Sequence, residues 1–85
     1  MTSSVESALN GLGLTLPEAI APVANYVPYV RTSNLLFVSG QISKTAAGAA
    51  VTGKLGVDVD VAGGQKAAEL CALNILAQVK AAMGD

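Results

Sequence analysis

The 85-residue sequence predicts an α+β fold, namely one half of a two-layer sandwich made of a β-hairpin, a short third strand and one long helix. Residues 25–31 are rich in β-forming side chains, residues 35–39 are a short apolar run, and turn-forming residues separate them. Residues 65–83 contain good helix formers throughout. A three-stranded sheet covered by one helix keeps an open edge and bare apolar area, so we also expect burial against further polypeptide.

The N-terminal part is predicted to be a lead of residues 1–15, followed by a half-domain of residues 16–85. Residues 3–12 permit a short or frayed helix, which Ser3 or Ser4 could cap and Gly11 and Gly13 would end. Two prolines within residues 15–22 predict an extended arm with a brief turn, because proline cannot continue a regular element.

The strands are predicted from three short segments. Pro28 lacks a backbone N–H, so the first strand is expected at a sheet edge or with an irregularity. The continuous apolar run at residues 35–39 predicts a strand that is buried on both faces. Gly40 would end that strand where the backbone comes close to another chain or a ligand. Residues 54–59 alternate weakly and predict the third strand.

The long helix is predicted to bury one apolar face and to end near Gly84. Leucines outside the main stripe indicate contact with more than one surface. Asp58 and Asp60 are interpreted as solvated loop residues that favour the helix N-terminus, not as a catalytic pair. Cys71 is interpreted as a small core residue, not a nucleophile. The predicted apolar face consists of Ala68, Cys71, Ala72, Ile75, Val79 and Ala82, and a second face carries Lys66, Glu69 and Lys80.

Composition excludes several classes of function. The net charge is −1 and the five basic residues are scattered singly, so no electrostatic footprint for nucleic acid is present. One cysteine and no histidine argue against an internal disulfide and against a zinc site, and we expect no metal and no cofactor. The sequence has neither a secretory signal pattern nor an apolar run long enough for a membrane span, which predicts a cytoplasmic protein.

Residues 25–41 resemble the first hairpin of the RidA family, also called YjgF or endoribonuclease L-PSP-like, with its apolar strand running into Ser39-Gly40-Gln41. Residues 52–56, 64–68 and 71–74 look like the next strand and first helix of that family. The resemblance spans residues 16–85 and implies the N-terminal half of a chorismate-mutase-like domain. It also implies a homotrimer or other homo-oligomer with ligand sites in the clefts between subunits.

The resemblance implies hydrolysis of reactive enamines and imines, such as 2-aminoacrylate, to a 2-oxo acid and ammonia. It places Tyr26, Ser39 and Gly40 at the substrate, with the Tyr26 hydroxyl as a hydrogen-bond partner and the Gly40 N–H as a donor to the substrate carboxylate. The family's substrate arginine and water-positioning glutamate belong to its second half. No catalytic residue is therefore expected within this chain, which alone should be inactive.

Other readings of the same residues stay open. Tyr26 could be an amphipathic packing residue, and Ser39 and Gly40 could simply end a strand in a tight bend. Ala24-Asn25 stand where many family members have Gly-Pro, which leaves the substrate range open. The chain could also be a non-catalytic module that binds small 2-oxo or 2-imino acids or another protein. A ribonuclease role is disfavoured by the absent basic patch and absent histidine.

Overall fold

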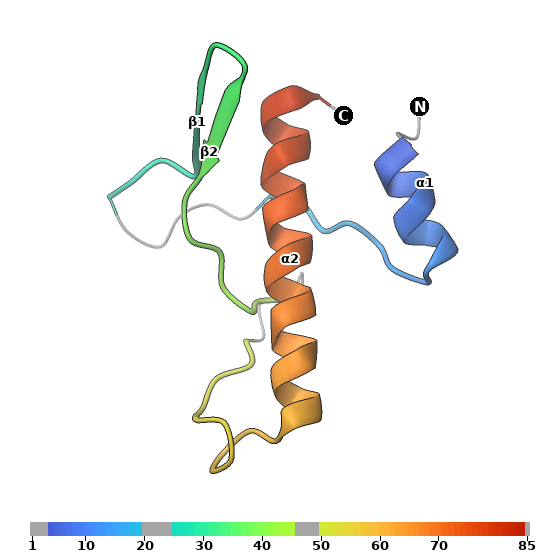
Figure 1. Cartoon of the computed structure of the whole chain (residues 1–85), viewed down its shortest axis with the longest axis vertical. Helices are drawn as coiled ribbons and strands as arrows, with labels where there is room; N and C mark the ends of the chain where they lie inside the picture. The colour runs from blue at the N-terminus through green and yellow to red at the C-terminus, as the bar shows by residue number, and fades with distance from the viewer. Residues whose placement is uncertain (1–3, 20–24, 46–49, 85) are drawn as a thin grey trace.

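The computed structural model describes residues 4–19, 25–45 and 50–84. Its elements in chain order are α1 (Ser4–Gly11), β1 (Tyr29–Thr32), β2 (Leu35–Val38) and α2 (Val61–Met83). Helix α2 forms the centre of the molecule, with the β1–β2 hairpin on one side and α1 on the other (Figure 1). The predicted α+β class, the hairpin and the long helix are confirmed.

The hairpin is antiparallel and runs in register from Tyr29 opposite Val38 to Thr32 opposite Leu35. A two-residue turn joins the strands, and its first residue, Ser33, has a left-handed φ of 53°, as tight hairpin turns require. Strand β1 begins four residues later than predicted. It starts directly after Pro28, which cannot donate a hydrogen bond to the ladder.

The two faces of the hairpin are unequal. Residues opposite one another in the register share a face, so Tyr29, Leu36 and Val38 form one face, and all three are half-buried. The other face carries Val30, Leu35 and Phe37, which are 51%, 59% and 58% exposed. We call these three residues the bare sheet face. The prediction that residues 35–39 are buried on both faces is therefore wrong for this chain, because α2 covers only one of them.

The predicted third strand is also absent from the described residues, where the sheet has only two strands. Residues 54–59 instead close into a tight turn, in which the Gly56 N–H donates to the Val59 carbonyl at 2.8 Å. A single bridge between Leu55 and Val59 is the only β-type pairing there. Gly56 has a φ of 82°, which bends the chain back where a strand would stay extended.

Helix α2 contains the predicted helical residues 65–83, starts at Val61 directly after Asp60, and ends as predicted. The Asp60 carboxylate accepts a hydrogen bond from the Gly63 N–H at 2.7 Å and so caps the helix start. Gly84, with a φ of 78°, ends the helix by donating its N–H to the Lys80 carbonyl. Gly64, which weakens the first turn in isolation, leaves room for Leu55, since a Cβ there would lie 2.6 Å from a Leu55 methyl. The roles predicted for Asp60 and Gly84 are confirmed.

The buried face of α2 differs from the predicted one. The most buried residues are Leu73, Asn74, Ala77 and Gln78. Three members of the predicted face, Ala68, Ala72 and Ile75, are exposed, and we call them the open flank. The remaining members, Cys71, Val79 and Ala82, are half-buried. The amide side chains of Asn74 and Gln78 lie on the inward side of α2. A face chosen by apolarity alone therefore lies to one side of the face that is buried.

Helix α1 lies on the side of α2 that faces away from the hairpin (Figure 1). Helix α1 confirms the predicted short helix, and Glu6 on it pairs with Lys80 on α2 at 2.7 Å. Residues 12–19 form no regular element, as expected for an extended arm, and the prediction for residues 20–22 falls outside the described residues. No helix within the described ranges is both long enough and apolar enough to cross a membrane.

The Asp60 cap provides a direct test of what fixes the start of α2. Replacing Asp60 with Ala removes the carboxylate that accepts from the Gly63 N–H, and we expect a loss of about 1 kcal/mol in the free energy of unfolding. Asp60→Asn keeps a capping oxygen and should lose much less. Urea titration followed by far-UV circular dichroism measures both, and equal losses in the two variants would contradict the cap.

Candidate functional site

The residues predicted to bind substrate lie at the open end of the hairpin, opposite its turn. The Ser39 N–H donates to the Pro28 carbonyl at 3.0 Å and extends the ladder by one step beyond β2. The Ser39 hydroxyl lies 3.0 Å from both the Val27 and the Pro28 carbonyl oxygens. Because a hydroxyl carries one proton, these two carbonyls share it. Ser39 therefore ties the end of β2 to the segment that precedes β1.

This tie places Tyr26 and Gly40 next to the same junction, one residue beyond Val27 and Ser39 respectively. Tyr26 is 43% exposed, so its ring is not part of the core of this chain. A Cβ built on Gly40 meets no atom within 4 Å, which leaves open space beside its backbone. The geometry is compatible with a ligand at this junction, and the binding roles of all three residues stay predictions.

A residue on α2 holds the segment that follows Gly40. The Asn74 side-chain amide donates to the Ile42 carbonyl at 2.8 Å and to the Lys44 carbonyl at 3.0 Å. Asn74 is only 1% exposed, and both bonds are part-buried. A buried amide that satisfies two carbonyls of an irregular segment fixes its path strongly. Asn74 thus anchors the candidate site to the helix.

Sequence reasoning assigned no role to Asn74. The available signal was an amide between Leu73 and Ile75, within an otherwise apolar stretch of the helix. Polar side chains in such a place are buried only when they are hydrogen-bonded, so the position itself predicts a partner in a neighbouring segment. The partner could not be read from the sequence, because Asn74 and Ile42 are 32 positions apart.

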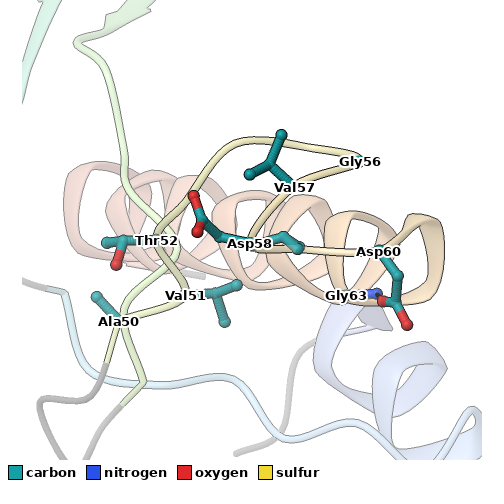
Figure 2. Close-up of a pocket in the computed structure, with 9 residues that line it drawn as sticks. Ala50, Val51, Thr52, Gly56, Val57, Asp58, Asp60 and Gly63 are labelled. Atoms are coloured by element: carbon teal, nitrogen blue, oxygen red, sulfur yellow. Dashed lines mark hydrogen bonds between the residues drawn. The ribbon is translucent and has the colours of Figure 1, made fainter.

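A hollow of about 640 Å³ lies elsewhere, beside the loop that leads into α2. Figure 2 shows it lined by Thr52, Val57 and Asp58, with Asp60 and Gly63 at the helix start. The Asp58 carboxylate accepts from the Lys54 N–H at 3.2 Å, and Asp60 caps α2. Both carboxylates serve the backbone, in agreement with their interpretation as local structural residues.

Neither a metal centre nor a reactive thiol is indicated in the described part of the chain. No three His, Cys, Asp or Glu side chains gather there in a way that could hold a metal ion. Cys71 is half-buried on α2, and it has no disulfide partner. Its predicted role as a small packing residue fits its position on the helix.

Comparison with known proteins places the chain in a family. The model of the family described as "YjgF/chorismate mutase-like, putative endoribonuclease" matches residues 6–85. The chain belongs to this family. Protein TCP17 of Trypanosoma cruzi is 47% identical to the YjgF chain over 81 residues. That alignment covers 95% of the chain and 51% of the T. cruzi protein.

Two crystal structures resemble the YjgF chain in fold. The protein Atu1372 of Agrobacterium tumefaciens, described as having unknown function, matches with a TM-score of 0.80 and 56% identity, over 94% of the YjgF chain and 48% of Atu1372. A "putative endoribonuclease" of Shewanella oneidensis matches with a TM-score of 0.89 and 38% identity, over 98% of the YjgF chain and 55% of its own. The chain therefore spans about half the length of these relatives.

Proposed function

We propose that the protein hydrolyses reactive 2-imino and 2-enamino acids to 2-oxo acids and ammonia, and that this chain carries one side of the substrate site. One observation carries the proposal. Within a chain of this family, the Ser39 tie brings Tyr26 and Gly40 to the same end of the hairpin, beside open space. The proposed ligand is a small acid, the reaction needs no metal or cofactor, and the proposed location is the cytoplasm.

The chemistry divides naturally between this chain and the rest of the site. An enamine first becomes the imine, as its β-carbon gains a proton and its nitrogen loses one. Water then adds to the imine carbon, the C–N bond breaks, and ammonia leaves as the C=O bond forms. A backbone N–H such as that of Gly40 can hold the substrate carboxylate, and a phenol such as Tyr26 can orient the reacting end. A base must also position the water. Asp58 and Asp60 bond their own backbone, so the base and a cationic clamp are expected from outside this chain.

The proposed site lies between subunits of a homotrimer or other homo-oligomer. The bare sheet face supports this assembly. It exposes three large apolar side chains to water, and their burial against a second subunit would lower the free energy. Each hairpin would then meet a second subunit on that face, near the junction that carries Tyr26 and Gly40.

The proposal is tested with a chimera in which the 85-residue chain is joined to the part of Atu1372 outside the match. Atu1372 is suitable because its matched part is 56% identical to this chain. The chimera should convert freshly generated 2-aminoacrylate to pyruvate faster than the buffer does, and the chain alone should not. A chimera that folds and assembles but leaves the rate at the buffer value would refute the deaminase function.

Tyr26 gives the residue-level prediction. In the active chimera, Tyr26→Phe removes one hydrogen bond to the substrate, and we expect kcat/KM to fall about five- to tenfold, in line with about 1 kcal/mol. Tyr29→Phe is the matched control, since Tyr29 lies within β1 and faces α2. An equal loss in both variants, or none in Tyr26→Phe, would exclude Tyr26 from the site.

A second function is favoured by the absence of a free carboxylate at the junction. The carboxylates of Asp58 and Asp60 are engaged with backbone elsewhere, so the described residues at the hairpin end offer hydrogen bonds but no base. A module that binds small 2-oxo acids without turnover fits this arrangement. Saturable pyruvate binding by the chimera, together with an unchanged rate of 2-aminoacrylate hydrolysis, would select it over the deaminase.

A further inference from the structure

A hollow separate from the hairpin end lies between α2 and the N-terminal arm, residues 12–19. Its volume is about 250 Å³, which is room for about eight water-sized groups at ~30 Å³ each. We call it the arm hollow. Its wall is almost entirely apolar, and neither Tyr26 nor Gly40 lines it. The lining includes Leu16 and Pro17 of the arm, Thr45, and Leu70, Leu73 and Asn74 of α2.

Two polar atoms of the lining residues lack a hydrogen-bond partner among the described residues. They are the side-chain oxygen Oδ1 of Asn74 and the hydroxyl oxygen Oγ1 of Thr45, and both are buried. The amide nitrogen of Asn74 faces the Ile42 and Lys44 carbonyls, which only accept, so Oδ1 is fixed on the other branch of the amide. Because buried polar groups of native proteins are nearly always paired, the two oxygens indicate a polar ligand group at this wall.

The two oxygens select the chemistry of that group. A carboxamide oxygen only accepts, whereas a threonine hydroxyl both donates and accepts, so one ligand hydroxyl can donate to Asn74 and accept from Thr45. A carboxylate has no proton to donate to Asn74. An ammonium would lose its hydration in a hollow that has no acidic side chain in its wall. A neutral hydroxyl on an apolar body fits both the oxygens and the leucines.

The arm is the part of the wall that can admit a ligand. Both oxygens are buried, so a ligand reaches them only if part of the wall moves outward slightly. Residues 15–17 form no backbone–backbone hydrogen bond with any other described residue, whereas Asn74 holds the segment after Gly40 with two bonds. The arm therefore moves at a lower cost in free energy than that segment does.

We propose that the arm hollow binds a small neutral alcohol. The ligand hydroxyl pairs with Asn74 Oδ1 and Thr45 Oγ1, and the apolar body packs against Leu16, Leu70 and Leu73. This site is independent of the proposed deaminase site, because it takes a neutral ligand at other contacts, whereas the hairpin end takes an acid. Binding here can succeed while imine hydrolysis fails.

The test is a titration of the ¹⁵N-labelled 85-residue chain with 3-methylbutan-1-ol, followed by the amide resonances. Saturable shifts are expected at Leu16, Thr45 and residues 70–74. Isobutyl methyl ether, an isomer of this alcohol without a proton to donate, should bind at least about fivefold more weakly, as one lost hydrogen bond predicts. No saturable shift at these residues, or equal affinities for the two isomers, would overturn the proposal. Tighter binding of 3-methylbutanoate than of the alcohol would overturn it as well.

Two pairs of variants locate the site. Thr45→Val keeps the shape of the side chain and removes its hydroxyl, and Leu70→Phe fills part of the arm hollow. Each should weaken binding of the alcohol at least about fivefold. Thr52→Val and Leu76→Phe are the matched controls, because neither residue lines the arm hollow. Thr45→Val should also leave the free energy of unfolding undiminished, since the hydroxyl that it removes has no partner among the described residues. Affinity that stays at the parent value in Thr45→Val would contradict the assignment.

Discussion

Asn74→Asp should destabilise the chain by about 3 kcal/mol or more, the largest loss that we expect from a single substitution. The change keeps the size of the side chain and removes both amide N–H donors, so the Ile42 and Lys44 carbonyls lose their partners. Asn74 is 1% exposed, so the new carboxylate is a buried charge without a partner that faces two carbonyl oxygens, and an uncompensated buried charge costs about 3–5 kcal/mol. Urea unfolding with a fluorescence or circular dichroism readout measures the loss.

The control for this experiment is Asn10→Asp, the same substitution on the exposed side of α1. It should change the free energy of unfolding by less than about 0.5 kcal/mol, as surface substitutions usually do. Similar losses in both variants would show that Asn74 does not anchor the segment after Gly40. In that case the candidate site would need another support.

Phe37→Glu should weaken self-association by at least about 30-fold. Phe37 is 58% exposed in the single chain, so most of its side chain faces solvent there. If a second subunit covers the bare sheet face, the substitution removes about 2 kcal/mol of association free energy from the burial of each Phe37 ring. It also places a charge in the interface. Sedimentation velocity of the chimera across a range of concentrations measures the association.

Val57→Glu is the control for the sheet face. Val57 is 73% exposed on the loop before α2, away from the hairpin, and the charge introduced is the same. We expect this variant to assemble like the parent. Unchanged assembly of Phe37→Glu would exclude the bare sheet face as the subunit contact and would remove the main support for a site between subunits.

Local signals in the sequence predict most of the fold, and long-range contacts decide the rest. The hairpin and both helix ends follow from turn residues, proline and capping groups, which act over a few residues. The prediction of a third strand was wrong because Gly56 turns residues 54–59 back on themselves. The predicted buried face of α2 was wrong because apolarity alone cannot show that Asn74 points inward. Its amide donates to a segment about 30 residues earlier in the chain.

The candidate site was located from a resemblance, and its geometry came from the structure. Composition alone gives Tyr26 and Gly40 no special role, because an exposed tyrosine and a glycine after a strand are common. The structure adds the Ser39 hydroxyl, which ties the two flanking segments together. The base and the cationic clamp are implied only by the resemblance, which assigns them to the second half of the family domain. The carboxylates of Asp58 and Asp60 accept from the backbone of their own loop.

The central claim is that a small acid binds at the open end of the hairpin. The most direct measurement is a titration of the ¹⁵N-labelled chimera with pyruvate, followed by the amide resonances. We expect saturable shifts at Gly40 and Tyr26, and weaker binding in the Tyr26→Phe variant. Shifts that centre instead on residues 50–63, around the hollow beside the start of α2, would contradict the claim.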